Sequence, residues 1–153
     1  MTEEDYRRAL DAAAKQLSYR ALSISQLRDK LLEKGHEEEA ADYAIAWLTE
    51  RGMLCDRTFA ESVVRTYAAR GCGKMRIRQE LTRRGVDRET ADEVLVDFSA
   101  DGDKLISLLD KRLKGDLSDR KEIDKAVAFL QRRGFCWQEI REALTAYEEQ
   151  LSE

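Results

Sequence analysis

Residues 76–98 read RIRQELTRRGVDRETADEVLVDF, and two other stretches of the chain follow the same pattern without a gap. Residues 26–48 read QLRDKLLEKGHEEEAADYAIAWL, and residues 125–147 read KAVAFLQRRGFCWQEIREALTAY. The offsets between the three stretches are 50 and then 49 residues. A period of this length indicates a chain built from tandem structural repeats.

The first half of each stretch ends in the same way. A leucine is followed four residues later by a glycine, and the pairs are Leu31 and Gly35, Leu81 and Gly85, and Leu130 and Gly134. Each glycine follows a basic residue, and a glycine behind such a helical run is typical of a left-handed C-terminal cap. We therefore predict that a helix ends at each of these glycines.

The second half of each stretch carries apolar residues at matched i, i+3, i+4 and i+7 positions. They are Ala41, Ala44, Ile45 and Leu48, then Ala91, Val94, Leu95 and Phe98, then Ile140, Ala143, Leu144 and Tyr147. This spacing places the four side chains on one face of an α-helix, and its recurrence in register predicts a second helix in each repeat.

About 25 residues precede each pair of helices, and these segments also have a helical pattern. Ser23 and Gln26 form the sequence signature of a capping box, and Asp56, Asp87 and Asp119 stand at plausible N-cap positions. Each repeat is therefore predicted to contain three helices.

Strand signals are absent, because β-branched residues are sparse and nothing alternates with a period of two. The chain also contains no proline. We predict an all-α fold of nine helices in three tandem three-helix repeats, stacked into an elongated, curved solenoid. The predicted repeats span residues 4–51, 55–99 and 101–150 of a single chain.

The composition indicates a folded, soluble protein. Charged residues make up 38% of the 153 and hydrophobic residues 42%, which is too apolar for a disordered chain and too polar for a membrane protein. The first residues lack the apolar run and cleavage site of a secretory signal, and no apolar stretch approaches the ~20 residues that span a bilayer. We expect a cytoplasmic protein and, because no heptad pattern predicts a coiled coil, a monomer.

The cysteines and the single histidine do not suggest a site. Cys55, Cys72 and Cys136 are odd in number and far apart, so we interpret them as reduced thiols rather than as a disulfide framework or a zinc site. His36 is a metal ligand or a general base in principle, but it has no second histidine or cysteine pair to join it, and we interpret it as a helix-boundary residue. We expect neither a metal nor a cofactor.

Residues 71–85, GCGKMRIRQELTRRG, gather positive charge in an acidic chain. They hold five cations and one anion, Glu80, whereas the whole chain has 27 basic and 31 acidic residues and carries −4. The remainder has 22 basic against 30 acidic residues, or −8. With the preceding helix, residues 65–84 reach +6 through seven cations: Arg65, Arg70, Lys74, Arg76, Arg78, Arg83 and Arg84. We call residues 65–84 the cationic stretch.

Helical geometry predicts how the cationic stretch faces water. With Ile77 and Leu81 on the buried side of the helix, Arg76 should project away from the core. Arg83 should do the same, and Lys74 and Arg78 should flank the buried side. Most of these charges are therefore expected to face solvent.

Residues 37–50 gather the opposite charge, −5, and contain no Lys or Arg. We interpret this acidic stretch mainly as a helix start, because Glu and Asp suit the first turn of a helix. Charge runs on helices are usually solvated faces, and that interpretation stays open for the cationic stretch too. The imbalance there nevertheless favours a partner, either nucleic-acid phosphates or an acidic protein surface. Duplex-binding proteins usually carry net positive charge and aromatic or base-reading residues, whereas this chain carries −4. A mixed target of protein and some nucleic acid therefore fits best.

Residues 56–86 resemble the central repeat of the RecX family, bacterial regulators of the RecA recombinase. The matching positions are Asp56, Phe59, Ala60, Glu61, Arg65, Gly73, Ile77, Glu80, Leu81, Gly85 and Val86. SISQLRDKLLEKG (23–35) resembles the first repeat of the family and AVAFLQRRGFCWQEIREAL (126–144) the third, so the likeness covers roughly residues 5–147. The family often has an aromatic-Gly-Pro turn before the central basic helix, where this chain has Cys72, Gly73 and Lys74; we expect the helix still to start there.

The resemblance implies an all-α fold of three tandem three-helix repeats. It also implies a function: the protein would lie in the deep groove of the RecA filament on single-stranded DNA, bridge its subunits, and inhibit ATP hydrolysis, strand exchange and coprotease activity. The contacts it implies are Arg70, Lys74, Arg76, Arg78, Arg83 and Arg84, to which the charge count adds Arg65. The acidic stretch would face protein or solvent.

The sequence also raises two alternative functions. In the first, the segments 74–85 and 25–35 act as helix-turn-helix readers of duplex DNA, which tight, sequence-dependent binding to naked DNA would support. The second, an enzyme, has little support, because Gly71 and Gly73 lack the third glycine and the preceding strand of a phosphate loop. One histidine also leaves no nucleophile, base and orienting group to nominate.

Overall fold

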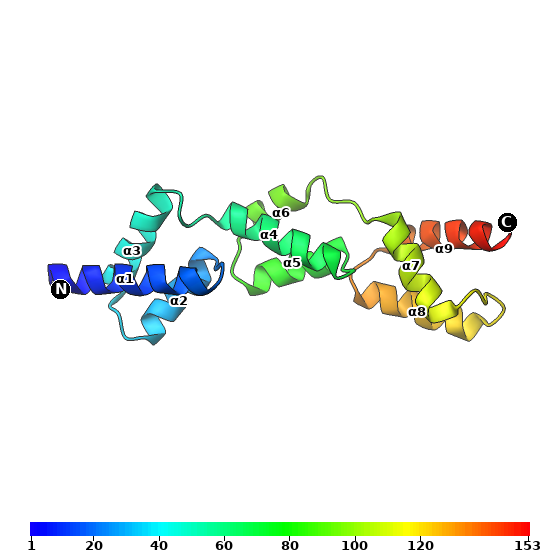
Figure 1. Cartoon of the computed structure of the whole chain (residues 1–153), viewed down its shortest axis with the longest axis horizontal. Coiled ribbons are helices and arrows are strands. Elements are labelled where there is room, and N and C mark those ends of the chain that lie inside the picture. The colour runs from blue at the N-terminus through cyan, green and yellow to red at the C-terminus, as the bar shows by residue number, and fades with distance from the viewer. The chain divides into compact units, whose positions relative to one another are not determined.

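The computed structural model describes all 153 residues and contains nine helices and no strand. In chain order they are α1 (Glu3–Tyr19), α2 (Ile24–Glu33), α3 (Glu38–Glu50), α4 (Asp56–Ala69), α5 (Lys74–Arg83), α6 (Arg88–Leu95), α7 (Gly102–Leu113), α8 (Arg120–Arg132) and α9 (Trp137–Leu151). They follow one another in three sets of three (Figure 1), which confirms the predicted all-α fold of three-helix repeats. None of these helices combines the length and the apolar character that crossing a membrane requires.

The chain divides into two compact units whose boundary falls inside the middle set of helices. The first unit comprises Met1–Ser62 and Leu81–Val94, and the second comprises Val63–Glu80 and Leu95–Glu153. Helices α4 and α5 therefore each contribute one end to the first unit and the other end to the second.

In the first unit, α1 packs against α2 and α3 around small and aliphatic side chains. This core consists of Ala9, Ala13, Leu22, Leu27, Leu31, Ala40, Ala41, Ala44, Leu48 and Leu54. Because alanine side chains are short, they allow neighbouring helices to approach closely at these positions. The expected apolar face of α3 is thus the face that is buried.

In the second unit, α7 packs against α8 and α9. Its core consists of Leu105, Leu109, Leu113, Ala126, Leu130, Phe135, Ile140, Ala143 and Tyr147. The hydroxyl of Tyr147 accepts a hydrogen bond from the Gly115 N–H at 2.8 Å and donates to Asp110 Oδ1 at 2.8 Å. Burial raises the pKa of Tyr147, and the bond to Asp110 adds to this, so the phenol stays protonated and ties α9 to the end of α7.

The three matched glycines end helices as predicted. Gly35, Gly85 and Gly134 have φ values of 92°, 84° and 98°. In each turn the residue after the glycine donates its N–H to the carbonyl of the matched leucine: His36 to Leu31 at 3.1 Å, Val86 to Leu81 at 3.0 Å and Phe135 to Leu130 at 3.1 Å. This is the hydrogen bond of a Schellman cap. In the Leu-x-x-x-Gly pattern, the glycine therefore marks the capping turn and the leucine marks the residue whose carbonyl accepts its hydrogen bond.

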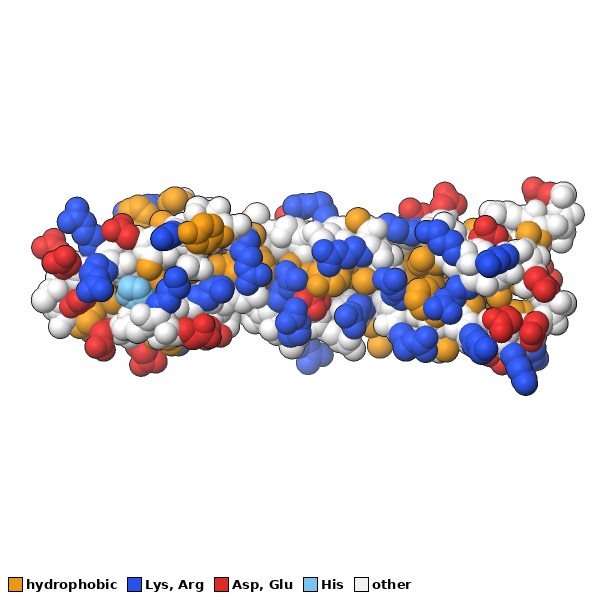
Figure 2. All heavy atoms as spheres, turned by 60° about the horizontal axis from the view of Figure 1, so that its bottom comes forward, with side chains coloured by type: hydrophobic (Ala, Val, Ile, Leu, Met, Phe, Trp, Pro, Cys, Tyr) orange, Lys and Arg blue, Asp and Glu red, His pale blue; other side chains and the backbone are white.

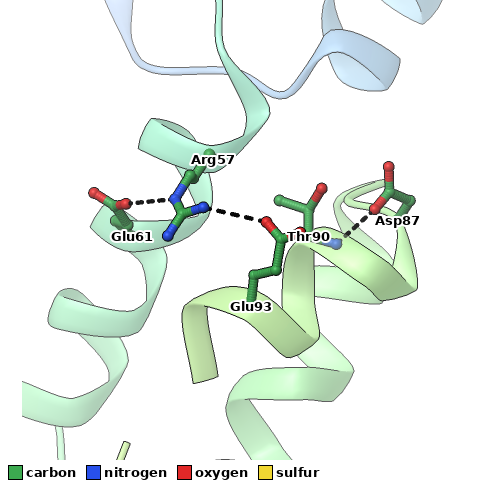
Figure 3. A network of polar contacts seen from close by, with 5 residues as sticks. All are labelled: Arg57, Glu61, Asp87, Thr90 and Glu93. Carbon is green, nitrogen blue, oxygen red and sulfur yellow. Dashed lines mark hydrogen bonds and ion pairs between the residues drawn. The ribbon is translucent and has the colours of Figure 1, made fainter. Parts of the chain in front are cut away.

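Most of the predicted N-caps are present. Ser23 and Gln26 form the capping box of α2. Asp119 accepts a hydrogen bond from the Lys121 N–H at 3.0 Å and caps α8. Asp87 accepts from the Thr90 N–H at 2.7 Å at the start of α6, as Figure 3 shows.

Asp56 was predicted as an N-cap, and that prediction is wrong. Asp56 is the first residue of α4, and its Oδ1 accepts from the Ile24 N–H at 2.8 Å, at the start of α2. Cys55 precedes it and accepts the first helical hydrogen bond from the Phe59 N–H at 3.0 Å. The carboxylate therefore caps a neighbouring helix rather than its own.

Helix α6 is shorter than its apolar stripe suggested. It ends at Leu95, and the Phe98 N–H donates to the Leu95 carbonyl at 3.0 Å in an irregular turn. The β-branched Val94 and Val96 have low helix propensity, which favours an early end. Between α4 and α6, Arg57 bonds Glu61 at 3.3 Å and Glu93 at 3.2 Å (Figure 3).

The start of α2 lies on the turn that ends α5, and we call this contact, within the first unit, the first joint. Ser23 is fully buried, and its Oγ donates to the Arg84 carbonyl at 2.5 Å. Ser25 lies so close to Gly85 that a Cβ added to Gly85 would fall 2.5 Å from the Ser25 Cβ.

The start of α5 lies in the same way on the turn that ends α8, and we call this contact, within the second unit, the second joint. The Gly73 N–H donates to the Arg133 carbonyl at 2.7 Å, and the Met75 N–H donates to the Gly134 carbonyl at 3.2 Å. A Cβ added to Gly73 would fall 2.5 Å from the carbonyl carbon of Gly134. The two joints have the same register, because Gly73 aligns with Ser23 and Arg133 with Arg84 in the repeats.

Candidate functional site

Helix α5 presents its cations as the sequence predicted. Ile77 and Leu81 are completely buried, whereas Arg76 and Arg83 are exposed. Lys74 and Arg78 flank the buried side and are half-buried. The helix also begins at Lys74, as expected despite the absence of a proline there.

The only anion of the cationic stretch is removed from the surface. Glu80 is only 6% exposed, and it has interaction partners within the protein. Burying a carboxylate is costly unless it is paired or hydrogen-bonded, so Glu80 has a structural role. As a result, residues 65–84 expose cations and no carboxylate, a stronger imbalance than the charge count of the stretch implies.

The end of α4 adds two exposed arginines. Arg65 and Arg70 are exposed, and neither forms an ion pair. The Arg70 guanidinium lies over the Tyr67 ring, 5.1 Å from its centroid. An aromatic face attracts a cation, so this contact limits the movement of the Arg70 side chain and leaves its charge available to a partner.

The seven predicted contact residues belong to both compact units. Arg65, Arg70, Lys74, Arg76 and Arg78 belong to the second unit, and Arg83 and Arg84 belong to the first. Arg84 is half-buried, and its carbonyl accepts the hydrogen bond from Ser23, so it also serves the first joint. On the face drawn in Figure 2, most of the charged side chains in the middle of the molecule are blue Lys and Arg.

Three arginines of the third repeat lie in the same unit as Arg76. They lie outside residues 65–84, so the charge count of the cationic stretch did not include them. Arg132 and Arg133 line a shared hollow with Arg76, and Arg112 stacks on Phe129 beside them. A signal for two of them was present in the sequence, because Arg132 and Arg133 align with Arg83 and Arg84 before the matched glycines.

The acidic stretch is largely engaged within the first unit. Arg28 bonds Glu38 at 3.1 Å and Asp42 at 2.9 Å, and both carboxylates raise the pKa of Arg28, Asp42 more than Glu38. The Tyr6 hydroxyl donates to Glu39 at 2.7 Å. Glu38 and Glu39 also lie in the first turn of α3, where the helix dipole favours negative charge. These contacts support the interpretation of this stretch as a helix start.

The histidine and the cysteines have local roles. His36 lies in the turn between α2 and α3, which confirms it as a helix-boundary residue. The three cysteines are free thiols. Hydrogen bonds from Thr58, its backbone N–H above all, lower the pKa of the Cys55 thiol. No group of three or more His, Cys, Asp or Glu residues is placed to hold a metal ion.

Three family models match consecutive parts of the chain. The model described as the first three-helix domain of RecX matches residues 9–48, the second matches residues 56–95 and the third matches residues 101–144. Together they cover all three sets of helices.

Curated relatives and solved structures agree with these matches. The chain is 37% identical to the regulatory protein RecX of Halorhodospira halophila, covering 91% of this chain and 88% of the relative. It is 36% identical to the regulatory protein RecX of Vibrio parahaemolyticus, covering 91% of each. The crystal structure of RecX from Lactobacillus salivarius matches with a TM-score of 0.88 at 24% identity, over 96% of this chain and 99% of that one.

Proposed function

Because the chain belongs to the RecX family of regulatory proteins, we propose that it binds the groove of the filament that the RecA recombinase forms on single-stranded DNA. Bound there, it inhibits the filament's ATP hydrolysis, strand exchange and coprotease activity. This activity places it in the control of homologous recombination, DNA repair and the SOS response.

The observation that carries this proposal is the composition of the exposed surface of residues 65–84. Arg65, Arg70, Arg76 and Arg83 are exposed there, and the single carboxylate of the stretch is buried. A surface of one sign attracts a partner of the opposite sign and orients it during the encounter. A filament on DNA supplies both phosphates and acidic protein side chains.

The mechanism needs no active site. A helical protein lodged in the filament groove opposes the subunit rearrangements that accompany the nucleotide cycle, and one bound molecule is enough to block the subunits it touches. The names of the relatives are in keeping with this, because they are those of regulatory proteins and not of enzymes.

Sequence-specific duplex binding through helix-turn-helix readers fits the joints less well. Such a reader places the N-terminal residues of its recognition helix against base edges in the major groove. Here the start of α5 donates hydrogen bonds to the turn that ends α8, and the start of α2 lies on the turn that ends α5. Both helix starts are therefore already engaged by protein.

The test reverses two charges that have no structural partner. Arg65 and Arg76 are exposed and form no ion pair, so Arg65→Glu with Arg76→Glu should leave the fold intact. We expect the concentration that half-inhibits the ATPase of RecA on single-stranded DNA to rise by about tenfold or more, since about 1.4 kcal/mol corresponds to a factor of ten. The measurement is an ATPase titration at two salt concentrations.

The matched control is Arg20→Glu with Arg141→Glu, which makes the same change in net charge at two exposed arginines outside the cationic stretch. We expect inhibition by this control to stay within about twofold of the wild type, because isolated surface charges contribute little. A wider variant, Arg76→Glu with Arg78→Glu and Arg83→Glu, should abolish inhibition; Arg78 and Arg83 have interaction partners within the protein, so its melting is measured beside that of the double variant. Equal inhibition by the double variant and its control would exclude this surface as the contact.

A further inference from the structure

A hollow lined by arginines lies between the start of α5 and the end of α8, within the second compact unit. Its volume is about 310 Å³, and its walls are formed by Cys72, Arg76, Phe129, Arg132 and Arg133. No carboxylate lines it. We call it the arginine hollow.

The charges of the arginine hollow are not neutralised within the protein. Arg76, Arg132 and Arg133 form no ion pair, and Arg76 and Arg132 are exposed. One nitrogen of Arg133, Nη1, donates to the Arg70 carbonyl at 3.1 Å. A guanidinium has five N–H donors, so this bond leaves most of the hydrogen-bonding capacity of Arg133 available.

One of the arginines that line the hollow, Arg133, is also held in place. The Arg133 guanidinium lies 5.1 Å from the centroid of the Phe129 ring, and that of Arg112 lies 3.9 Å from it. The second joint fixes the backbone next to these groups through the bonds from Gly73 to Arg133 and from Met75 to Gly134. Donors that are fixed before a ligand arrives lose less conformational entropy on binding.

We propose that the arginine hollow binds a phosphate group, carried either by a polynucleotide or by a free nucleotide. A carboxylate has two oxygens, which a single guanidinium fork satisfies. A phosphate has oxygens in several directions and accepts from more than one fork at once. The volume of about 310 Å³ leaves room for a phosphate, because it exceeds several-fold the ~30 Å³ that one water molecule occupies.

This site goes beyond the proposed function, although it shares Arg76 with the proposed filament contact. It adds Arg132 and Arg133 of the third repeat, and it needs no recombinase in order to bind. Binding measured with the isolated protein therefore tests it separately: loss of filament inhibition would not remove the phosphate site, and loss of the phosphate site would not remove the filament contact.

The experiment measures binding of a fluorescent oligothymidylate to the full chain by anisotropy, over a series of salt concentrations. Arg132→Ala should raise Kd about five- to tenfold at low salt and reduce the magnitude of the salt slope by about 0.7, the value for one single-strand phosphate contact. The matched control is Arg141→Ala, another exposed arginine without an ion pair in the same unit, which should stay within about twofold of wild type. Identical behaviour of the two variants would overturn the proposal.

Arg132→Lys separates the contribution of the bidentate guanidinium contact from that of the positive charge. It should keep the salt slope and lose about two- to threefold in affinity, because lysine cannot make a bidentate contact. Competitors then identify the source of the phosphate: displacement of the oligothymidylate by ATP assigns the hollow to a free nucleotide, and persistence assigns it to a polynucleotide. Displacement by a polyglutamate of the same charge, as effective as that by unlabelled oligothymidylate, would contradict a phosphate site.

The reactivity of Cys72 can report whether the phosphate binds in the hollow, because Cys72 lines it. The other two cysteines are exposed and do not line the hollow. In a chain carrying Cys55→Ser and Cys136→Ser, a saturating oligonucleotide should slow alkylation of Cys72 severalfold, and Arg132→Ala should remove this protection. Binding without protection of Cys72 would place the phosphate elsewhere. Unchanged melting of Arg132→Ala, followed by circular dichroism, serves as the folding control.

Discussion

The turn that ends α5 and the turn that ends α8 each receive the start of another helix, but different groups make the two contacts. At the first joint the donor is a side chain, the Ser23 hydroxyl, and Asp56 adds a second side-chain bond to the Ile24 N–H. At the second joint the donors are the backbone N–H groups of Gly73 and Met75.

The same register is thus held in two ways. Both receiving turns need a glycine, Gly85 or Gly134, and the joints differ at the aligned positions 23 and 73. The first joint depends on the presence of an oxygen at position 23, whereas the second depends on the absence of a Cβ at position 73, because Gly73 and the backbone of Gly134 touch directly. Removing the oxygen at position 23 should therefore damage the first joint, and adding a Cβ at position 73 should damage the second. This difference could not be read from helix periodicity, which is the same at both places.

The largest effect should come from adding a methyl group at the second joint. Gly134→Ala places a Cβ on the backbone of Arg76, and it does so at a φ of 98°. We expect a loss of roughly 3 kcal/mol or more in the free energy of unfolding, the combined effect of left-handed strain and overpacking. Chemical denaturation followed by circular dichroism measures it.

The matched control for this change is Gly35→Ala, which has nearly the same φ, 92°, but no atom within 4 Å of the added Cβ. It should lose only about 1–2 kcal/mol, the cost of the left-handed backbone conformation. Equal losses in the two variants would show that the close contact at the second joint contributes nothing.

A smaller effect is expected from removing one oxygen at the first joint. Ser23→Ala deletes the donor to the Arg84 carbonyl and the acceptor for the Gln26 N–H. It should lose about 1–2 kcal/mol, the sum of a lost cap and a buried carbonyl left without its donor. Ser23→Thr keeps the hydroxyl and should recover part of the loss, and a neutral Ser23→Ala would mean that the first joint does not depend on this oxygen.

The smallest effect concerns the charge on Asp56. Burial, and to a lesser extent repulsion from Asp87, raises the pKa of this carboxyl above 3.8, although the bond from Ile24 opposes the shift. Because the folded pKa is the higher one, the folded state prefers the protonated carboxyl, and the stability this gives at low pH is lost as pH rises through the folded pKa. Asp56→Asn removes the charge and keeps an oxygen for the Ile24 N–H.

At pH 7 this variant should be as stable as the wild type or more stable by up to about 0.5 kcal/mol. Its advantage should shrink as pH falls toward 4, where the wild-type carboxyl also becomes neutral. Thermal melting at the two pH values measures the trend, and an advantage that grows at low pH would contradict the assigned direction of the pKa shift.

Local signals predicted the helix ends well because each signal and its partner are close in the sequence. Gly85 and Leu81 lie within one turn, and so do Ser23 and Gln26, so a pattern of a few residues contains the whole contact. Asp56 fits an N-cap pattern equally well, but its partner is Ile24, 32 positions away, and a local pattern cannot identify it.

The candidate site shows the same limit. Helical periodicity correctly separated the exposed Arg76 from the buried Ile77. Charge counting, however, treats every charge alike, so it could not show that Glu80 is buried. Nor could it show that Arg132, more than fifty residues along the chain, shares a hollow with Arg76.

The two joints also bear on how such a chain can grow. The middle repeat holds both halves of the contact, a helix start that donates at Gly73 and a turn that accepts at Arg84. In the first repeat the turn at Gly35 has open space above it, and in the third the position matching Gly73 is Glu122, inside α8. Tandem duplication of the middle segment would therefore insert a unit whose two faces already match their neighbours, and a gene could change its number of repeats without evolving a new interface.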